Sequence, residues 1–288
     1  MGYNAGMRHT LASDRFGAAS SGRPVVFVHG AFVTHAMGRS ALPASLIDQH
    51  PCLSVGLPGH AGSPPGAWAD ATAEGLADLL AATLREAGIG DDAAVVGHSL
   101  GGLAALCLAC RRPGRVAAVA CVSGTAGGLF RGGEHATPLQ RVAVAAAASP
   151  TAFQLGVRLG SCSVLLHRWL AGLAAGDAAA LRRSPGFRAA SRAYLPALWR
   201  APTEPMRRAL RALAGLDLRE NLPELALPTL FLHGGADPVF PVGAAGDAAA
   251  ACSAARLAVL PGVGHLPMFE APAACGRTLQ AWIDSIDR

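Results

Sequence analysis

Short runs of apolar residues alternate along the chain with longer segments in which apolar residues recur every three or four positions. The short runs are continuous, which is typical of strands buried on both faces of a parallel sheet. We predict strands at residues 24–29, 52–56, 93–98, 116–123, 228–234 and 256–261. The periodic segments predict helices at residues 70–88, 100–111, 242–252 and 271–286.

Strands that alternate with helices predict right-handed βαβ units, and therefore an α/β fold with a mostly parallel sheet and helices on both faces. Residues 124–226 interrupt the alternation, because they are rich in Ala, Leu, Arg and Pro and contain no clear strand. We interpret them as several short helices that form an insertion, or lid. The expected parts are a first core segment at 1–125, the lid at 126–222 and a second core segment at 223–288.

A serine lies between two glycines directly after one of the predicted strands. The sequence Gly-His-Ser-Leu-Gly at residues 97–101 also precedes a predicted helix. A sharp strand-to-helix turn projects the serine hydroxyl above the sheet edge, with small neighbours because larger ones would collide with backbone. The N-terminus of the following helix favours negative charge. We therefore predict that Ser99 is a nucleophile rather than a small turn residue.

A serine nucleophile needs a base, and the chain contains ten histidines. His265 is the strongest candidate, because it lies in a loop after the last predicted strand that can reach across the top of the sheet. His98 adjoins Ser99, but neighbouring strand residues face opposite sides. His29 and His233 end strands and precede glycine, which suits supporting or turn roles. The alternative for His265 is a surface loop histidine without a catalytic role.

A serine nucleophile with a histidine base also needs an acid and an oxyanion hole. Asp237 follows a predicted strand, where it would orient the histidine and stabilise its cation. The alternative is structural, since Asp-Pro pairs commonly begin turns. For the oxyanion hole we predict the backbone N–H of Leu100 and that of Ala31, in the His-Gly-Ala-Phe loop, with Phe32 as the competitor of Ala31.

Five motifs together resemble the α/β-hydrolase family, in its lid-bearing esterase-like branch, over nearly the whole chain. The chain order Ser, Asp, His is the one expected of that family. The resemblance implies a hydrolase of esters, thioesters or lactones that forms an acyl-enzyme and needs no cofactor or metal. Members with an aspartate nucleophile, such as epoxide hydrolases and dehalogenases, are disfavoured by Ser99. The motifs are VVFVHGAF (25–32), LPGHAGS (57–63), GHSLGG (97–102), HGGADPVFP (233–241) and PGVGHLPMFEAP (261–272).

The composition agrees with a large apolar core, since 51% of the 288 residues are hydrophobic and 15% are charged. All 24 basic residues are arginine, which excludes Schiff-base chemistry and a lysine base within this chain. The seven cysteines are scattered and odd in number, which does not suggest a disulfide framework. Cys107 and Cys110 form a C-x-x-C on a predicted apolar helix, where packing is favoured over a redox or metal role.

No segment of the sequence resembles a targeting or spanning element. The first residues lack the apolar segment of a signal peptide, and no apolar run is long enough to cross a membrane. We therefore expect a soluble, cytoplasmic protein.

Charge is concentrated in the expected lid. Residues 131–219 hold 13 arginines and four acids, a net charge of +9, whereas the rest of the chain carries −4. One hypothesis is that the basic lid, including Arg182, Arg183, Arg207 and Arg208, recruits an anionic substrate or an acidic acyl carrier protein by electrostatic steering. The alternative is a solvated basic face without a partner. No nucleic-acid-binding motif accompanies the arginines.

Several aromatic residues of the insertion, together with one in the oxyanion loop, are candidates for an apolar acyl pocket. They either line such a pocket beneath the lid or pack the lid itself. The candidates are Phe32, Phe153, Phe187, Trp169 and Trp199.

Two other functions stay open beside the hydrolase. The same three residues would serve an acyltransferase, a cyclase or a C–C bond hydrolase, which differ from an esterase in their products. A non-catalytic ligand receptor on the same scaffold is the third hypothesis, although a binder has no need of a complete triad.

Overall fold

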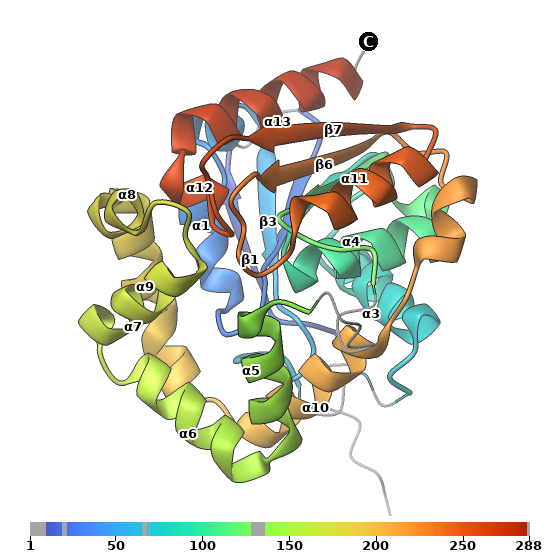
Figure 1. The fold of residues 1–288 in the computed structure, drawn as a ribbon. Helices are drawn as coiled ribbons and strands as arrows, with labels where there is room; N and C mark the ends of the chain where they lie inside the picture. Colours follow the sequence, from blue (N-terminus) through green and yellow to red (C-terminus); the bar gives the residue numbers. More distant parts are fainter. Residues whose placement is uncertain (1–9, 19–21, 65–67, 69, 128–135, 287–288) are drawn as a thin grey trace, which may run out of the picture.

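A single seven-stranded sheet forms the centre of the computed structural model, which describes residues 10–18, 22–64, 68, 70–127 and 136–286 (Figure 1). The strand order is β1-β3-β2-β4-β5-β6-β7; β1 runs antiparallel to β3, and the other neighbours are parallel. The strands are β1 Ser13–Gly17, β2 Val25–Val28, β3 Pro51–Val55, β4 Ala94–His98, β5 Ala118–Val122, β6 Thr229–Gly234 and β7 Ala255–Leu260.

The six predicted strands are all present, each within two residues of the expected bounds at either end. Every residue of β2, β4, β5 and β6 is buried, which explains why their sequences are continuously apolar. The additional strand β1 lies at the sheet edge and has the mostly polar sequence SDRFG, so it carries no apolar run.

Helices cover both faces of the sheet. The helices α3, α4 and α11 pack on one face, and α2 and α13 pack on the other (Figure 1). The four predicted core helices correspond to α3, α4, α11 and α13. The helices outside the insertion are α1 Gly38–Ala41, α2 Ala44–Gln49, α3 Ala73–Glu86, α4 Leu100–Arg111, α11 Val242–Ala251, α12 Pro267–Glu270 and α13 Pro272–Ile286.

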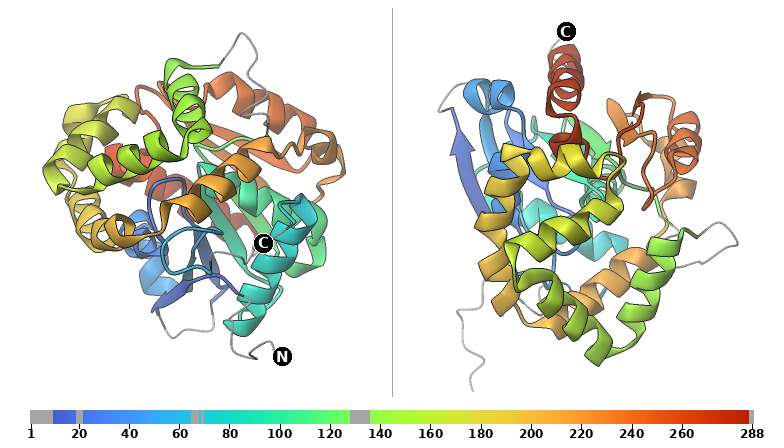
Figure 2. Two further views of the ribbon diagram at one scale, coloured as in Figure 1. Left: turned by 90° about the horizontal axis from the view of Figure 1, so that it is seen from below. Right: turned by 60° about the vertical axis from the view of Figure 1, so that its left-hand side comes forward.

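Between β5 and β6 the described chain is helical, as expected for the insertion. Its two ends meet, because Gly127 and Asp217 form an isolated bridge and the Leu218 N–H donates to the Ala126 carbonyl. Figures 1 and 2 show these helices gathered together at one end of the sheet, with α8 beside α12. They are α5 Pro138–Ala148, α6 Pro150–Ser161, α7 Val164–Ala171, α8 Ala178–Arg183, α9 Pro185–Arg200 and α10 Thr203–Gly215, with a 3₁₀ turn η3 at Gly172–Ala174.

The two cysteines of the C-x-x-C motif both lie on α4. Cys107 is fully buried on α4 and Cys110 is partly buried there; neither is in a disulfide. Burial raises the pKa of the Cys110 thiol to about 11, so it stays protonated at neutral pH.

Within the described ranges, no helix combines the length and the apolar character needed to cross a bilayer.

Candidate active site

Ser99 lies at the sharp turn between β4 and α4. Its backbone is in the left-handed region, with φ 57° and ψ −122°, which is strained for a residue with a side chain. The flanking glycines permit this turn: a Cβ on Gly97 would collide with the Gly101 carbonyl, and a Cβ on Gly101 would collide with that of Val28. The predicted strand-turn-helix context of Ser99 is therefore present.

A hydrogen-bond chain joins three residues that are far apart in the sequence. His265 Nε2 lies 3.0 Å from Ser99 Oγ, and His265 Nδ1 lies 2.9 Å from Asp237 Oδ2. Because a carboxylate only accepts, Nδ1 carries the proton and Nε2 is left with a lone pair toward the serine hydroxyl. The structure thus brings Ser99, His265 and Asp237 together with the histidine able to accept a proton from the serine.

Asp237 is held in place on both of its oxygens. Oδ1 accepts the Val239 N–H at 2.8 Å and the Phe240 N–H at 3.0 Å, while Oδ2 faces His265. Burial by itself would raise the pKa of this carboxyl, but His265 and the two backbone N–H groups outweigh burial and lower the pKa. Asp237 is therefore an anion at neutral pH and can stabilise a protonated His265.

The neighbouring histidine of the serine supports the base rather than replacing it. His98 Nε2 donates to the His265 carbonyl at 2.9 Å, and the two ring centroids lie 5.0 Å apart. Burial, with a contribution from His265, lowers the pKa of His98 to about 3, so its ring is neutral. Through its hydrogen bond to the His265 carbonyl, His98 braces the loop that carries His265.

The other two strand-end histidines hold backbone near the site. His29 Nε2 accepts the Leu57 N–H at 3.1 Å, so its Nδ1 carries the proton that Gly30 O accepts at 2.7 Å. His233 Nε2 donates to the Phe240 carbonyl at 2.8 Å. Both contacts agree with the supporting roles expected of these residues.

The buried neutral histidines predict an acid-labile fold. Burial lowers the pKa of His60 to about 4 and that of His98 to about 3, and it also lowers the pKa of His29 and His233. Below about pH 6.5, the ordinary histidine pKa, the unfolded chain binds more protons than the folded chain. The free energy of unfolding therefore decreases as the pH is lowered. Each such histidine lowers the free energy of unfolding by about 1.4 kcal/mol for each unit by which the pH falls between its unfolded and folded pKa values.

We therefore expect the melting temperature to fall steadily from about pH 6.5 to about pH 4, the window between the unfolded and the folded histidine pKa values. Thermal unfolding followed by circular dichroism at constant ionic strength measures this. A melting temperature that stays level across that window would contradict the neutral, buried state of these rings.

The two residues predicted as oxyanion donors belong to the helix start after Ser99 and to the turn after β2, which approaches Ser99. Leu100 is the first residue of α4, so its N–H has no carbonyl partner within the helix. Ala31 lies in the turn after β2, and the following residue, Phe32, has a φ of 59°. Gly30 permits the approach of this turn to the serine, because a Cβ there would come within 2.9 Å of Ser99 Cβ.

The aromatic candidates separate into two groups. The Phe32 and Phe153 rings lie 5.8 Å apart, which places the insertion against the loop that contains Ala31. Trp169 and Trp199 instead expose 58% and 45% of their surface. The expectation of a place beneath the lid therefore does not hold for these two tryptophans. Phe187 is buried and packs against Phe269 of α12, so its role is packing.

Glu270 joins the helical insertion to the loop that carries His265, a role that its position in the sequence does not reveal. Its Oε2 accepts the N–H groups of Gly176, Asp177 and Gly264 at 2.8, 3.1 and 2.9 Å. Its Oε1 accepts the Leu266 N–H at 3.1 Å. The insertion also contacts the base directly, because the His265 N–H donates to the Ala174 carbonyl at 2.8 Å.

We expect Glu270→Ala to lower kcat by about 10²-fold, because a misplacement of about 1 Å at the reacting groups has an effect of that size. Glu270→Gln retains one acceptor oxygen, so its kcat is expected to lie between that of the wild type and that of Glu270→Ala. The matched control is Asp177→Ala, which removes a carboxylate that caps α8 but does not accept from the His265 loop.

Rates are measured well below the melting temperature of each variant, together with the rate at which a fluorophosphonate labels the serine. If the role of Glu270 were purely structural, Glu270→Ala and Glu270→Gln would lower the melting temperature, but folded Glu270→Ala protein would be labelled at the wild-type rate.

The arginines of the insertion are not equivalent. Arg207 and Arg208 both pair with Glu204, at 2.7 and 2.9 Å, so their charge is partly neutralised. Arg182 and Arg183 end α8 and have exposed side chains. Of these four arginines, Arg182 and Arg183 are therefore the more available to an anionic partner.

Comparisons with known proteins agree with the fold. The model of the alpha/beta hydrolase family matches residues 25–277. A pimeloyl-[acyl-carrier protein] methyl ester esterase from Aromatoleum aromaticum is 32% identical over 234 residues, covering 81% of this chain and 86% of that protein. A protein of the same name from Xanthomonas axonopodis pv. citri is 28% identical over 266 residues, 92% of this chain and 96% of its own.

Among solved structures, an esterase from Rhodococcus sp. ECU1013 is 26% identical with a TM-score of 0.72, covering 95% of this chain and 94% of that one. A thermophilic esterase from Thermogutta terrifontis, 24% identical with a TM-score of 0.71, covers 96% of this chain and 93% of its own. The likeness to the second structure concerns the fold alone.

Proposed function

The chain belongs to the α/β-hydrolase family, and on this premise we propose that it hydrolyses carboxylic esters with Ser99 as nucleophile, His265 as general base and Asp237 as the acid. The observation that carries the proposal is the hydrogen-bond chain from Asp237 through His265 to Ser99. The names of the two bacterial relatives and of the Rhodococcus structure support ester cleavage as the reaction.

The first half of the reaction forms an acyl-enzyme. His265 Nε2 takes the proton of Ser99 as Oγ attacks the ester carbonyl carbon, and Asp237 stabilises the resulting imidazolium. The tetrahedral oxyanion accepts hydrogen bonds from the N–H groups of Leu100 and Ala31, each worth about 10²–10³ in kcat. The bond to the leaving alcohol breaks, and the alcohol oxygen takes the proton from His265.

The second half repeats these steps with water as the nucleophile. His265 takes a proton from water as the water oxygen attacks the acyl carbon, and the oxyanion again rests on the two backbone N–H groups. When the intermediate collapses, Ser99 Oγ leaves and recovers its proton from His265. The net reaction converts one ester and one water into a carboxylic acid and an alcohol.

The test is intact-mass spectrometry after treatment with a fluorophosphonate probe, on the wild-type protein and on Ser99→Ala. We expect one label on the wild type and none on the variant, and release of both acid and alcohol from an ester substrate. Acylated acceptor formed in abundant water would favour an acyltransferase. Wild-type protein that is folded but neither labelled nor hydrolytic would overturn the proposal in favour of a ligand receptor.

For the substrate class, we infer a methyl ester on an acyl chain that is attached to an acyl carrier protein. The two relatives carry that activity in their names, and this chain covers 86% and 96% of their lengths. Carrier proteins of this kind are acidic, which complements the exposed arginines at the end of α8. A Ser-His-Asp site of the proposed kind cleaves methyl esters without further groups.

Charge reversal of Arg182 and Arg183 tests this inference. At low salt we expect about tenfold lower kcat/KM for the carrier-bound methyl ester, and little change for the same acyl methyl ester on free pantetheine. The matched control reverses Arg256 and Arg277, two exposed arginines on β7 and α13. Equal kcat/KM of wild type for the carrier-bound and the free substrate would contradict a carrier-protein partner.

A further inference from the structure

The helical insertion exposes large apolar side chains at regular spacing on α6, α7 and η3. On α6, the residues Phe153 and Val157 face inward, while Leu155 and Leu159 are more than half exposed. On α7 no residue is buried, and Leu165 exposes 76% of its surface. We define the outer face of the insertion as Leu155, Leu159, Leu165, Trp169 and Leu173, which are spaced four residues apart within each of their two segments.

The helices and the turn that carry this face have charges of one sign only; the next acidic residue along the chain is Asp177, which caps α8. Residues 136–176, which include α5, α6, α7 and η3, contain three arginines and neither aspartate nor glutamate. An exposed apolar face of this kind, without acids and with arginine nearby, is typical of helices that lie in the interface of an anionic membrane.

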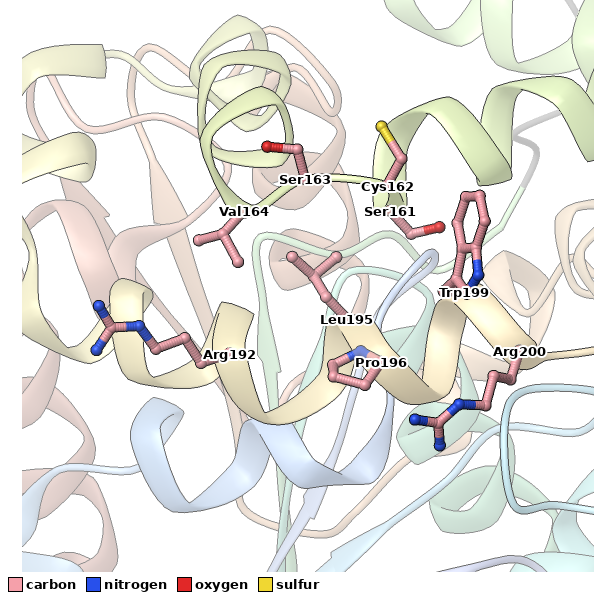
Figure 3. Close-up of a pocket in the computed structure, with 9 residues that line it drawn as sticks. All are labelled: Ser161, Cys162, Ser163, Val164, Arg192, Leu195, Pro196, Trp199 and Arg200. Atoms are coloured by element: carbon pink, nitrogen blue, oxygen red, sulfur yellow. The ribbon is translucent and has the colours of Figure 1, made fainter.

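A groove beside the outer face continues this pattern. It has a volume of about 370 Å³ and lies between α9 and the junction of α6 with α7. Figure 3 shows Leu195, Pro196 and Trp199 along the groove, with Arg192 and Arg200 at its two ends. None of its nine lining residues is acidic, and none belongs to the proposed triad.

Trp199 marks the boundary between the apolar and the charged surface. Its ring is half exposed, and the Arg158 guanidinium lies over it, 5.6 Å from the ring centroid. Tryptophan and arginine both combine an apolar body with a polar group, so they are favoured where hydrocarbon meets headgroups.

We propose that the outer face of the insertion binds the surface of an anionic lipid bilayer, with Arg192 and Arg200 on phosphate groups and the leucines inserted between headgroups. A second copy of the chain is a poorer occupant, because a symmetric contact would place arginines against arginines. An acidic protein would satisfy the arginines, but its acidic side chains would give the exposed Leu155, Leu159 and Leu165 of α6 and α7 no apolar contact. This proposal does not depend on the esterase activity or on Arg182 and Arg183.

The test is co-sedimentation of the full chain with vesicles. We expect binding to vesicles of phosphatidylcholine mixed with phosphatidylglycerol and at least about tenfold weaker binding to pure phosphatidylcholine. The variant Leu159→Ser/Leu165→Ser should lose at least about tenfold in affinity for the mixed vesicles. Its matched control is Leu257→Ser/Val259→Ser, two exposed apolar residues of β7.

A second pair of variants tests the charge. Arg192→Gln/Arg200→Gln should weaken binding to the mixed vesicles, whereas Arg256→Gln/Arg277→Gln should not. Circular dichroism melting of every variant shows whether it is folded, irrespective of esterase activity. Wild-type protein that does not bind the mixed vesicles would overturn the proposal. Binding that the two leucine substitutions leave unchanged would also overturn it, even if the two arginine substitutions abolish that binding.

Discussion

Replacing His265 with alanine is expected to lower kcat for ester hydrolysis by about 10⁶-fold, the loss typical when the base of a serine triad is removed. His265 Nε2 is the acceptor 3.0 Å from the Ser99 hydroxyl, so without it the serine keeps its proton at neutral pH. Steady-state kinetics with an activated ester measure the loss. Unchanged melting temperature would show that the loss is chemical.

The double variant makes this prediction sharper. Because the serine and the histidine act as one unit, His265→Ala combined with Ser99→Ala should cost no more than either change alone. His98→Asn is the matched histidine control, since His98 is also buried and its ring centroid lies 5.0 Å from that of His265. A folded His265→Ala protein that retains one hundredth of wild-type activity would show that another group acts as base.

The fold was predictable because its strands are buried on both sides. Strands such as β4 and β5 need apolar residues at every position, and that demand leaves a continuous signal in the sequence. The edge strand β1 is under no such demand: its residues alternate in exposure and its sequence is mostly polar, so its pairing with β3 is visible only in the structure.

The candidate site divides in the same way. Ser99, Asp237 and His265 each follow a strand and stand among glycines or prolines, so their types and positions in the chain indicate a shared sheet edge. Glu270 gives no comparable signal, because its partners are backbone N–H groups, two of them more than 90 residues away. Residue type does not specify those partners.

The direction of the tryptophans could not be predicted for a related reason. Trp169 lies on α7, a short helix with apolar residues on most of its faces, so periodicity does not distinguish an inward from an outward side. A buried acyl pocket and an exposed apolar surface both require aromatic and aliphatic residues. Only the structure, in which no residue of α7 is buried, separates the two.

Asp237→Asn is expected to lower kcat by about 10⁴-fold, as the same change does in other serine triads. The contacts of Asp237 determine how the asparagine would lie. Oδ1 accepts the Val239 and Phe240 N–H groups, so the amide oxygen would take that place and the NH₂ would face His265 Nδ1. Nδ1 would then have to accept, and the ring proton would move to Nε2.

A proton on Nε2 removes the lone pair that takes the proton from Ser99, which is why a substitution of nearly identical shape is expected to have so large an effect. The matched control is Asp247→Asn, an exposed aspartate on α11. The measurements are kcat and the rate of fluorophosphonate labelling, with melting temperature as the check on folding. If folded Asp237→Asn kept more than about a tenth of wild-type kcat, Asp237 would be a turn-forming residue rather than the acid of the triad, since its loss would leave the His265 tautomer unaffected.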